Sequence, residues 1–214
     1  NAGTGISAMS FYWVTWSPEQ EKFFAVGDAS LSPTNYNYAS STDGKVFGNE
    51  KFNNFDNNST YYSVTAGPSN TVVACGYKNL SYSTDGGDTW NKGQGPSGIT
   101  EQYWYSVDYY DGWYVAVTYS DPTYVARSQD GINWEWGNGG NFISLTNPRI
   151  IKGGQGKFVI VDTVAPNSGK KAWAWSEDHG DTWTISEESI TTGYWNSLDY
   201  GNNMWIAAAY DKDS

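Results

Sequence analysis

Ser83-Thr84-Asp85-Gly86-Gly87-Asp88-Thr89-Trp90 is the stretch that decides the fold, because the chain repeats it. The same order of serine, aspartate, glycine and a following aromatic residue returns in residues 41–47, 128–134 and 176–183. The first serines of the four copies lie 42, 45 and 48 residues apart. Self-similarity at such a period indicates one supersecondary unit repeated, in which each copy needs its neighbours to bury its apolar face.

Each copy has the composition of a tight hairpin turn. The aspartate can accept hydrogen bonds from backbone N–H groups of the turn, and glycine permits the positive φ that such turns need. The aromatic residue can cover the turn and pack toward the sheet. The residues assigned to this structural role are Ser41, Asp43, Gly44, Ser83, Asp85, Gly87, Trp90, Ser128, Asp130, Gly131, Trp134, Ser176, Asp178, Gly180 and Trp183.

Two kinds of strand recur before the copies. A near-continuous apolar run, typical of a strand covered on both faces, appears in residues 22–26, 71–75, 113–117, 157–161 and 204–209. A shorter strand precedes each run, in residues 13–16, 61–64, 104–107, 147–150 and 195–198. No segment has a sustained helical period. The predicted unit is therefore a four-stranded antiparallel meander, present four times, with a fifth copy that stops after two strands.

The repeated motif resembles the Asp-box (BNR-type) repeat, Ser-x-Asp-x-Gly-x-Thr-Trp, of β-propeller proteins, and residues 83–90 and 176–183 fit the full pattern. The resemblance implies an all-β fold, a single β-propeller domain over residues 1–214. Blades are expected at about residues 11–52, 60–93, 103–137 and 146–186, with a partial blade at 194–214. Either residues 5–10 add a strand to the last blade and close a five-bladed ring, or the chain is a segment of a larger propeller.

The composition of the chain disfavours several classes of function. The formal net charge of −11, from 23 acidic and 12 basic residues, disfavours binding to nucleic acid or to anionic membrane surfaces. No apolar run is long enough to insert into a bilayer. Cys75 is the single cysteine, so it forms no internal disulfide, and its apolar neighbours predict a small buried side chain.

No cofactor or metal is predicted. The paired aspartates of the motif supply too few oxygens for a Ca²⁺ site, and His179 is the single histidine. The resemblance to sialidases would imply three arginines that clamp a substrate carboxylate, whereas the chain has two, Arg127 and Arg149. A glycosidase needs two paired carboxylates. The candidates occupy matching places in different repeats, which favours a structural role: Asp28, Asp108, Asp121, Asp162, Asp199 and Asp211.

The aromatic content, 12 Trp, 17 Tyr and 8 Phe, gives the best functional hint. Exposed rings beside Asn, Ser and Asp can stack on sugar C–H faces, although the same rings can also pack between blades. The candidate ligand-binding residues lie in or next to the loops of one propeller face: Tyr36, Tyr77, Tyr103, Trp104, Tyr119, Tyr124, Tyr194 and Trp195.

The expected function is a non-enzymatic binding or structural module on an exterior surface, extracellular or on a virion. A phage tail or fibre component or a secreted lectin-like protein fits, with carbohydrate or a protein surface as the partner, within a larger assembly. The alternative is a fragment of an Asp-box glycoside hydrolase that acts on polysaccharide. An assembly chaperone like the photosystem factors of the same family is disfavoured, because two arginines do not make a basic docking patch.

Overall fold

The computed structural model describes residues 10–28, 37–50, 60–120, 123–137, 145, 147–163, 173–187 and 194–210. Within these residues the chain forms five antiparallel sheets and one short 3-10 helix, η1 (Ile99–Glu101). No helix in this part of the chain is long and apolar enough to cross a membrane. The all-β expectation is therefore confirmed.

Four of the sheets contain four strands each, paired in chain order. The first and second sheets are β1 (Ser10–Ser17), β2 (Lys22–Asp28), β3 (Tyr38–Ser41), β4 (Gly48–Glu50), β5 (Tyr61–Ala66), β6 (Val72–Gly76), β7 (Asn79–Ser83) and β8 (Asn91–Lys92). The third and fourth are β9 (Trp104–Tyr110), β10 (Trp113–Thr118), β11 (Val125–Ser128), β12 (Glu135–Trp136), β13 (Pro148–Gly154), β14 (Lys157–Asp162), β15 (Trp173–Ser176) and β16 (Thr184–Ile185). The fifth sheet contains only β17 (Tyr194–Gly201) and β18 (Met204–Tyr210).

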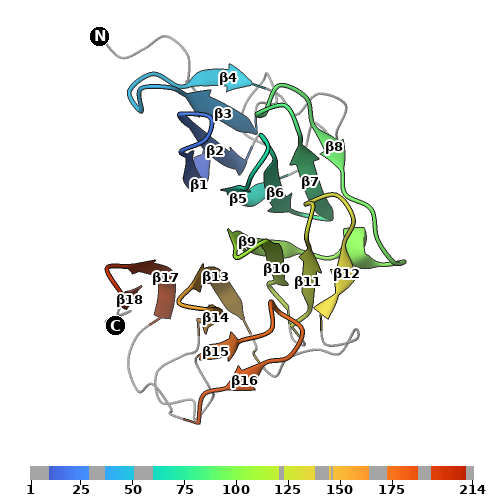
Figure 1. Cartoon of the computed structure of the whole chain (residues 1–214), viewed down its shortest axis with the longest axis vertical. Coiled ribbons are helices and arrows are strands. Elements are labelled where there is room, and N and C mark those ends of the chain that lie inside the picture. Colours follow the sequence, from blue (N-terminus) through green and yellow to red (C-terminus); the bar gives the residue numbers. More distant parts are fainter. Residues whose placement is uncertain are drawn as a thin grey trace.

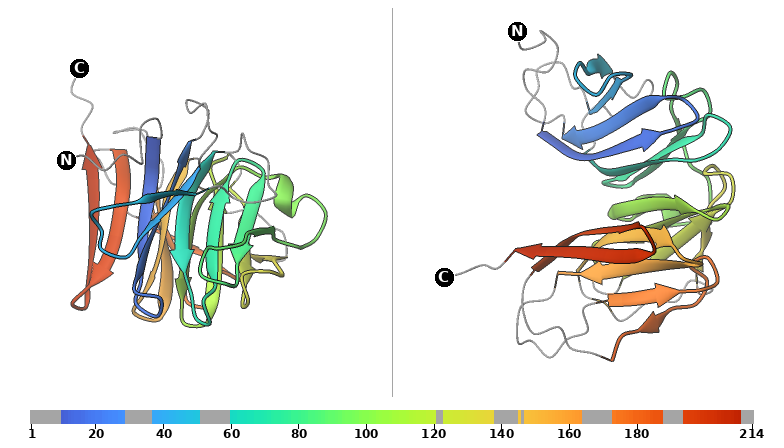
Figure 2. Two further views of the ribbon diagram at one scale, coloured as in Figure 1. Left: turned by 90° about the horizontal axis from the view of Figure 1, so that it is seen from above. Right: turned by 60° about the vertical axis from the view of Figure 1, so that its left-hand side comes forward.

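The five sheets stand side by side in an open arc (Figure 1). The first strands of consecutive sheets pack against each other, β1 on β5, β5 on β9, β9 on β13 and β13 on β17. These strands therefore line the inside of the arc, and the fourth strands lie at its rim (Figures 1 and 2). The arrangement is that of β-propeller blades, four complete and one with two strands. Residues 5–9, part of the expected closing strand, lie outside the described residues.

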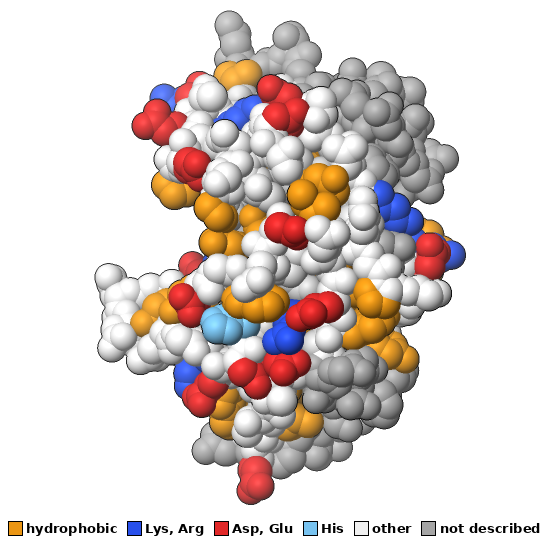
Figure 3. Space-filling view, turned by 45° about the vertical axis from the view of Figure 1, so that its right-hand side comes forward, with side chains coloured by type: hydrophobic (Ala, Val, Ile, Leu, Met, Phe, Trp, Pro, Cys, Tyr) orange, Lys and Arg blue, Asp and Glu red, His pale blue; other side chains and the backbone are white. Residues whose placement is uncertain are grey.

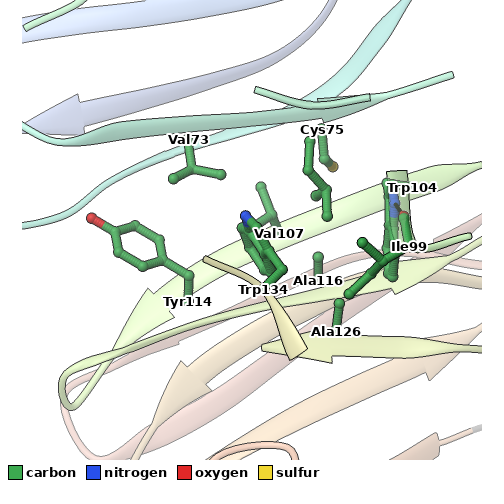
Figure 4. Close-up of a cluster of buried hydrophobic side chains, with 10 residues drawn as sticks. Val73, Cys75, Ile99, Trp104, Val107, Tyr114, Ala116, Ala126 and Trp134 are labelled. Carbon is green, nitrogen blue, oxygen red and sulfur yellow. Dashed lines mark hydrogen bonds between the residues drawn. The ribbon is translucent and has the colours of Figure 1, made fainter. Parts of the chain in front are cut away.

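The apolar second strands form the core because both of their faces are covered. In β6, Val73 and Cys75 face the third sheet, whereas Val72 and Ala74 face the first. Figure 4 shows the resulting cluster between the second and third sheets, in which Trp134 lies among side chains from both. Burial raises the pKa of the Cys75 thiol well above its ordinary value, as expected for the small buried side chain that the sequence predicts.

The second strand of the fifth sheet differs. Residues 204–209 have the apolar pattern of the other second strands, so we expected cover on both faces. Instead Met204 and Ile206 are 56% and 59% exposed, and Trp205 is half-buried. The reason is that, among the described residues, no third strand pairs with β18 and no further sheet packs on it.

The repeated motif forms the turn between the third and fourth strands of each complete sheet, as predicted. In the second sheet, Ser83 Oγ donates to Asp85 Oδ1 at 2.7 Å and accepts from Gly87 N at 2.8 Å. Asp85 Oδ1 also accepts from Thr89 N at 2.8 Å. Burial alone would raise the pKa of the Asp85 carboxyl. The hydrogen bonds have the larger effect, so the pKa lies below its ordinary value. The turn is thus held by its own side chains.

The motif tryptophans Trp90, Trp134 and Trp183 each pack on the sheet before their own. Trp90 lies in one cluster with Phe24 and Tyr38 of the first sheet, and its Nε1 donates to Gly87 O at 3.0 Å. Trp134 packs in the same way against Cys75 and Leu80 of the second sheet. The motif therefore serves both as a turn and as the contact between neighbouring sheets.

Candidate functional site

All five first strands contain a β-bulge at the same place. The strand register shifts by one residue between Tyr61 and Ser63, for example, which leaves Tyr62 outside the regular pairing. A bulge frees one residue from the ladder and turns its side chain in a new direction. The five residues at this position are Tyr12, Tyr62, Tyr105, Arg149 and Asn196.

The five bulged residues meet at one pocket. They line a cavity of about 190 Å³, together with Trp13, Ser106 and Ile150. The first strands of the sheets line the inside of the arc (Figure 1). Since each of the five sheets contributes a residue of its first strand, the pocket lies there too. We call it the axial pocket.

A row of tyrosine rings forms one wall of the axial pocket. The ring centroids of Tyr12 and Tyr62 are 5.7 Å apart, and those of Tyr62 and Tyr105 are 4.7 Å apart and stacked. Tyr119 continues the row at 5.2 Å from Tyr105. Burial raises the pKa values of Tyr12 and Tyr62 further above neutral pH. Their phenol groups can donate as well as accept hydrogen bonds.

Arg149 supplies the positive charge of the axial pocket. Its Nη1 donates to Tyr105 Oη at 2.8 Å, and its guanidinium lies 5.2 Å and 5.0 Å from the ring centroids of Tyr105 and Tyr119. Its Nε is buried without a hydrogen-bond partner. Within the described part of the chain no carboxylate pairs with it, whereas Arg127 pairs with Glu135 at 2.8 Å and Asp181 at 3.2 Å. A fixed guanidinium without a counter-charge suits a ligand carboxylate.

Three of the predicted ligand-binding tyrosines gather beside this pocket. Tyr77 and Tyr103 are 4.4 Å apart between ring centroids, and Tyr119 N donates to Tyr103 O at 3.0 Å. Their side chains are 37%, 49% and 38% exposed, in the order Tyr77, Tyr103, Tyr119. Because Tyr119 also contacts Tyr105, the exposed rings extend the aromatic surface outward from the axial pocket.

The structure contradicts the ligand role predicted for Trp104. Its side chain is fully buried, and its Nε1 donates to Ile99 O at 2.7 Å. The bulge explains the error, because it presents Tyr105 to the axis and leaves Trp104 between sheets. Aligning the repeats would have placed Tyr12, Tyr62, Tyr105, Arg149 and Asn196 in one column, so the sequence did contain the signal for the axial pocket.

The remaining predicted residues lie elsewhere. Tyr124 packs on Trp136 with ring centroids 5.7 Å apart and does not line the axial pocket. Trp195 lines a different cavity, between the fourth and fifth sheets. Tyr36 lies outside the described residues, and the side chain of Tyr194 is not described.

The described candidate carboxylates have structural partners. Burial raises the pKa of Asp108, and the charge of Lys152, whose Nζ lies 3.5 Å from Asp108 Oδ2, offsets part of this rise. Asp199 Oδ1 lies 3.8 Å from the same Nζ. Asp162 accepts from Asn147 N at 3.0 Å, and Asp28 accepts from Thr60 Oγ1 at 3.3 Å. None of them lines the axial pocket. Asp121 and Asp211 lie outside the described residues.

The single histidine lies on the outer surface. His179 Nε2 is 3.0 Å from Asp111 Oδ2, and its ring stacks on Trp113 with centroids 5.7 Å apart. Figure 3 shows the pale-blue histidine with basic and acidic side chains beside it. Among the described residues no group of three His, Cys, Asp or Glu side chains could hold a metal ion.

No protein-family model and no curated protein matches this chain. Solved structures do match. YCF48 from Cyanidioschyzon merolae gives a TM-score of 0.61 at 15% identity, over 92% of this chain and 65% of that chain. YCF48 bound to D1 peptide gives 0.66 at 14% identity, over 92% and 59%. An ancestral GH74 enzyme gives 0.68 at 17% identity, over 100% of this chain and 28% of that chain.

These neighbours are β-propeller proteins, which agrees with the fold described above. At such identity the likeness shows the fold alone. The chain spans less than two thirds of either YCF48 chain and less than a third of the GH74 enzyme.

Proposed function

We propose that this chain is a non-enzymatic binding module of the Asp-box propeller family and that its ligand occupies the axial pocket. The observation that carries the proposal is the set of five equivalent bulges, which brings three tyrosines, one arginine and one asparagine to a single cavity. Convergent polar groups between aromatic walls are typical of small-ligand sites.

The ligand we propose is a saccharide that carries a carboxylate, such as a uronic acid unit. The rings of Tyr12, Tyr62 and Tyr105 offer flat faces for sugar C–H groups, and their hydroxyls can bond sugar hydroxyls. Arg149 favours an acidic sugar over a neutral one, because it has no ion-pair partner in the described part of the chain. An exterior setting, extracellular or on a virion, fits such a ligand.

The test uses a glycan array that contains neutral and uronic-acid oligosaccharides, followed by calorimetry with the Arg149→Gln variant. A hydrogen bond to a charged group is worth about 1.5–3 kcal/mol, so binding of the acidic oligosaccharide should weaken at least about tenfold. Arg127→Gln is the matched control, since Arg127 is already paired with Glu135. Equal binding of neutral and acidic oligosaccharides, or no loss with Arg149→Gln, would refute the acidic-sugar proposal.

Two alternatives to the saccharide-binding proposal are suggested by particular structural neighbours. The likeness to the GH74 enzyme covers the whole chain, which favours a hydrolase fragment as the second candidate. A reducing-sugar release assay separates the two, because turnover by this chain would contradict a purely binding role. Likeness to YCF48 bound to D1 peptide favours a peptide ligand, so peptides should be titrated beside the sugars.

A further inference from the structure

A second cavity, of about 590 Å³, lies between the fourth and fifth sheets. The apolar part of its wall from the fourth sheet consists of Val159 and Val161 of β14 with Trp173 and Trp175 of β15. Trp205 belongs to the opposite wall, and Lys157 lies at the edge beside Glu177. In Figure 2 the fourth sheet and the two-stranded fifth sheet form the end of the arc. We call this cavity the terminal groove.

At the three interfaces between complete sheets, the corresponding space is filled. Trp90 of the second sheet packs on Phe24 and Tyr38. Trp134 packs on Cys75 and Leu80. At the third interface the cluster around Trp183 includes Val115 and Val125. In each case the repeated motif of one sheet covers the second and third strands of the sheet before it.

The motif glycines fit closely against these strands. A Cβ added to Gly131 would lie 2.7 Å from Val73 Cγ2, and one added to Gly180 would lie 3.0 Å from Val115 Cγ1. Val73, Val115 and Val159 hold equivalent positions in β6, β10 and β14. Val159 lines the terminal groove, where no motif from the described residues covers it.

The charges at the groove edge also repeat an interface that is already filled. Lys22 begins β2, and its Nζ lies 3.3 Å from Gly86 O and 4.0 Å from Asp88 Oδ1 of the next motif. Lys157 begins β14 at the equivalent position, since both lysines pair with the end of the first strand of their sheet. Lys157 pairs instead with the exposed Glu177 at 3.1 Å, so its ammonium lies at the edge of the groove.

The edge of β18 supplies backbone partners. The second strands of the four complete sheets pair on both sides, whereas β18 pairs with β17 alone among the described residues. An unpaired strand edge is a template for a further strand. The terminal groove therefore presents a strand edge, an apolar wall and a lysine.

We propose that the terminal groove binds a β-hairpin of the Asp-box type from a partner segment. Its first strand pairs antiparallel with β18, and its tryptophan covers Val159 and Val161. Its second acidic residue, the equivalent of Asp88, pairs with Lys157. The inference does not depend on the ligand of the axial pocket.

The experiment tethers a probe hairpin to the full chain. A copy of residues 79–92, which contains a complete motif, is added after Ser214, because a tether raises the local concentration of the hairpin. Hydrogen exchange of the amides in β18 is then compared with that of the chain alone. We expect exchange to slow at least about tenfold, since these amides gain partners and cover.

The matched control carries alanine in place of the tryptophan that copies Trp90. Slower exchange that depends on this tryptophan, and that weakens with Lys157→Glu in the extended chain, is the expected result. Lys92→Glu serves as the control for charge, because Lys92 lies away from the groove on β8. Exchange in β18 that is the same with the intact copy, the alanine copy and no copy would overturn the proposal. Neither outcome bears on the proposal that the axial pocket binds oligosaccharides.

Discussion

The inter-sheet role of the motif tryptophan predicts a large loss of stability in Trp134→Ala. Trp134 is 3% exposed and lies among Val73, Cys75 and Leu80 of the second sheet. Its Nε1 donates to Gly131 O at 3.2 Å. Removing a buried aromatic side chain costs about 3–5 kcal/mol. We therefore expect the free energy of unfolding to fall by about 4 kcal/mol, a large part of a typical domain's stability.

Urea unfolding followed by far-ultraviolet circular dichroism measures this change. The matched control is Trp16→Ala, since Trp16 is 42% exposed on β1 and should cost about 1 kcal/mol or less. Trp134→Phe keeps a ring in place and loses the N–H donor, so an intermediate loss is expected. A Trp134→Ala variant as stable as Trp16→Ala would refute the idea that this side chain joins two sheets.

Three further predictions concern the motif. Asp178→Ala removes the acceptor of Ser176 Oγ and Thr182 N, both at 2.8 Å, and should lower the free energy of unfolding by about 2 kcal/mol. The control is Asp181→Ala, which breaks an ion pair with Arg127 and should cost less than about 1 kcal/mol in the same urea titration. Gly131→Ala should destabilise more than Gly112→Ala, because both have positive φ but only the new Cβ at position 131 meets a neighbour; equal thermal midpoints would contradict the close fit. The pKa values of the four motif aspartates, Asp43, Asp85, Asp130 and Asp178, are lowered, so their stabilisation is present above the ordinary carboxyl pKa of about 3.9 and lost as the pH falls through the lower folded values. Acid unfolding of Asp130→Asn should accordingly be less steep than that of the parent chain.

The fold could be predicted because its signals are local and repeated. The motif that ends at Trp90 specifies a turn with its own side chains, and each apolar run specifies a strand with two covered faces. Such signals do not depend on distant residues. The four complete sheets run from Ser10 to Glu50, Tyr61 to Lys92, Trp104 to Trp136 and Pro148 to Ile185, one for each copy of the repeat.

The axial pocket was missed because one residue of register changes which side chain faces the axis. Trp104 was a candidate because it lies next to a loop of the expected ligand face, but the bulge presents Tyr105 to the pocket and leaves Trp104 in the core. The terminal groove could not be predicted from the pattern of residues 204–209, because that pattern is the same whether the strand is covered or exposed. Cover depends on neighbours outside the strand.

The bulges have a consequence for how this architecture acquires specificity. Because a bulged residue lies outside the ladder, exchanging it changes the contacts within the axial pocket and leaves the strand pairing of its sheet intact. Tyr62, Arg149 and Asn196 already occupy the equivalent bulge position in three different sheets. New recognition chemistry can therefore be installed with five substitutions, while folding remains the task of other residues.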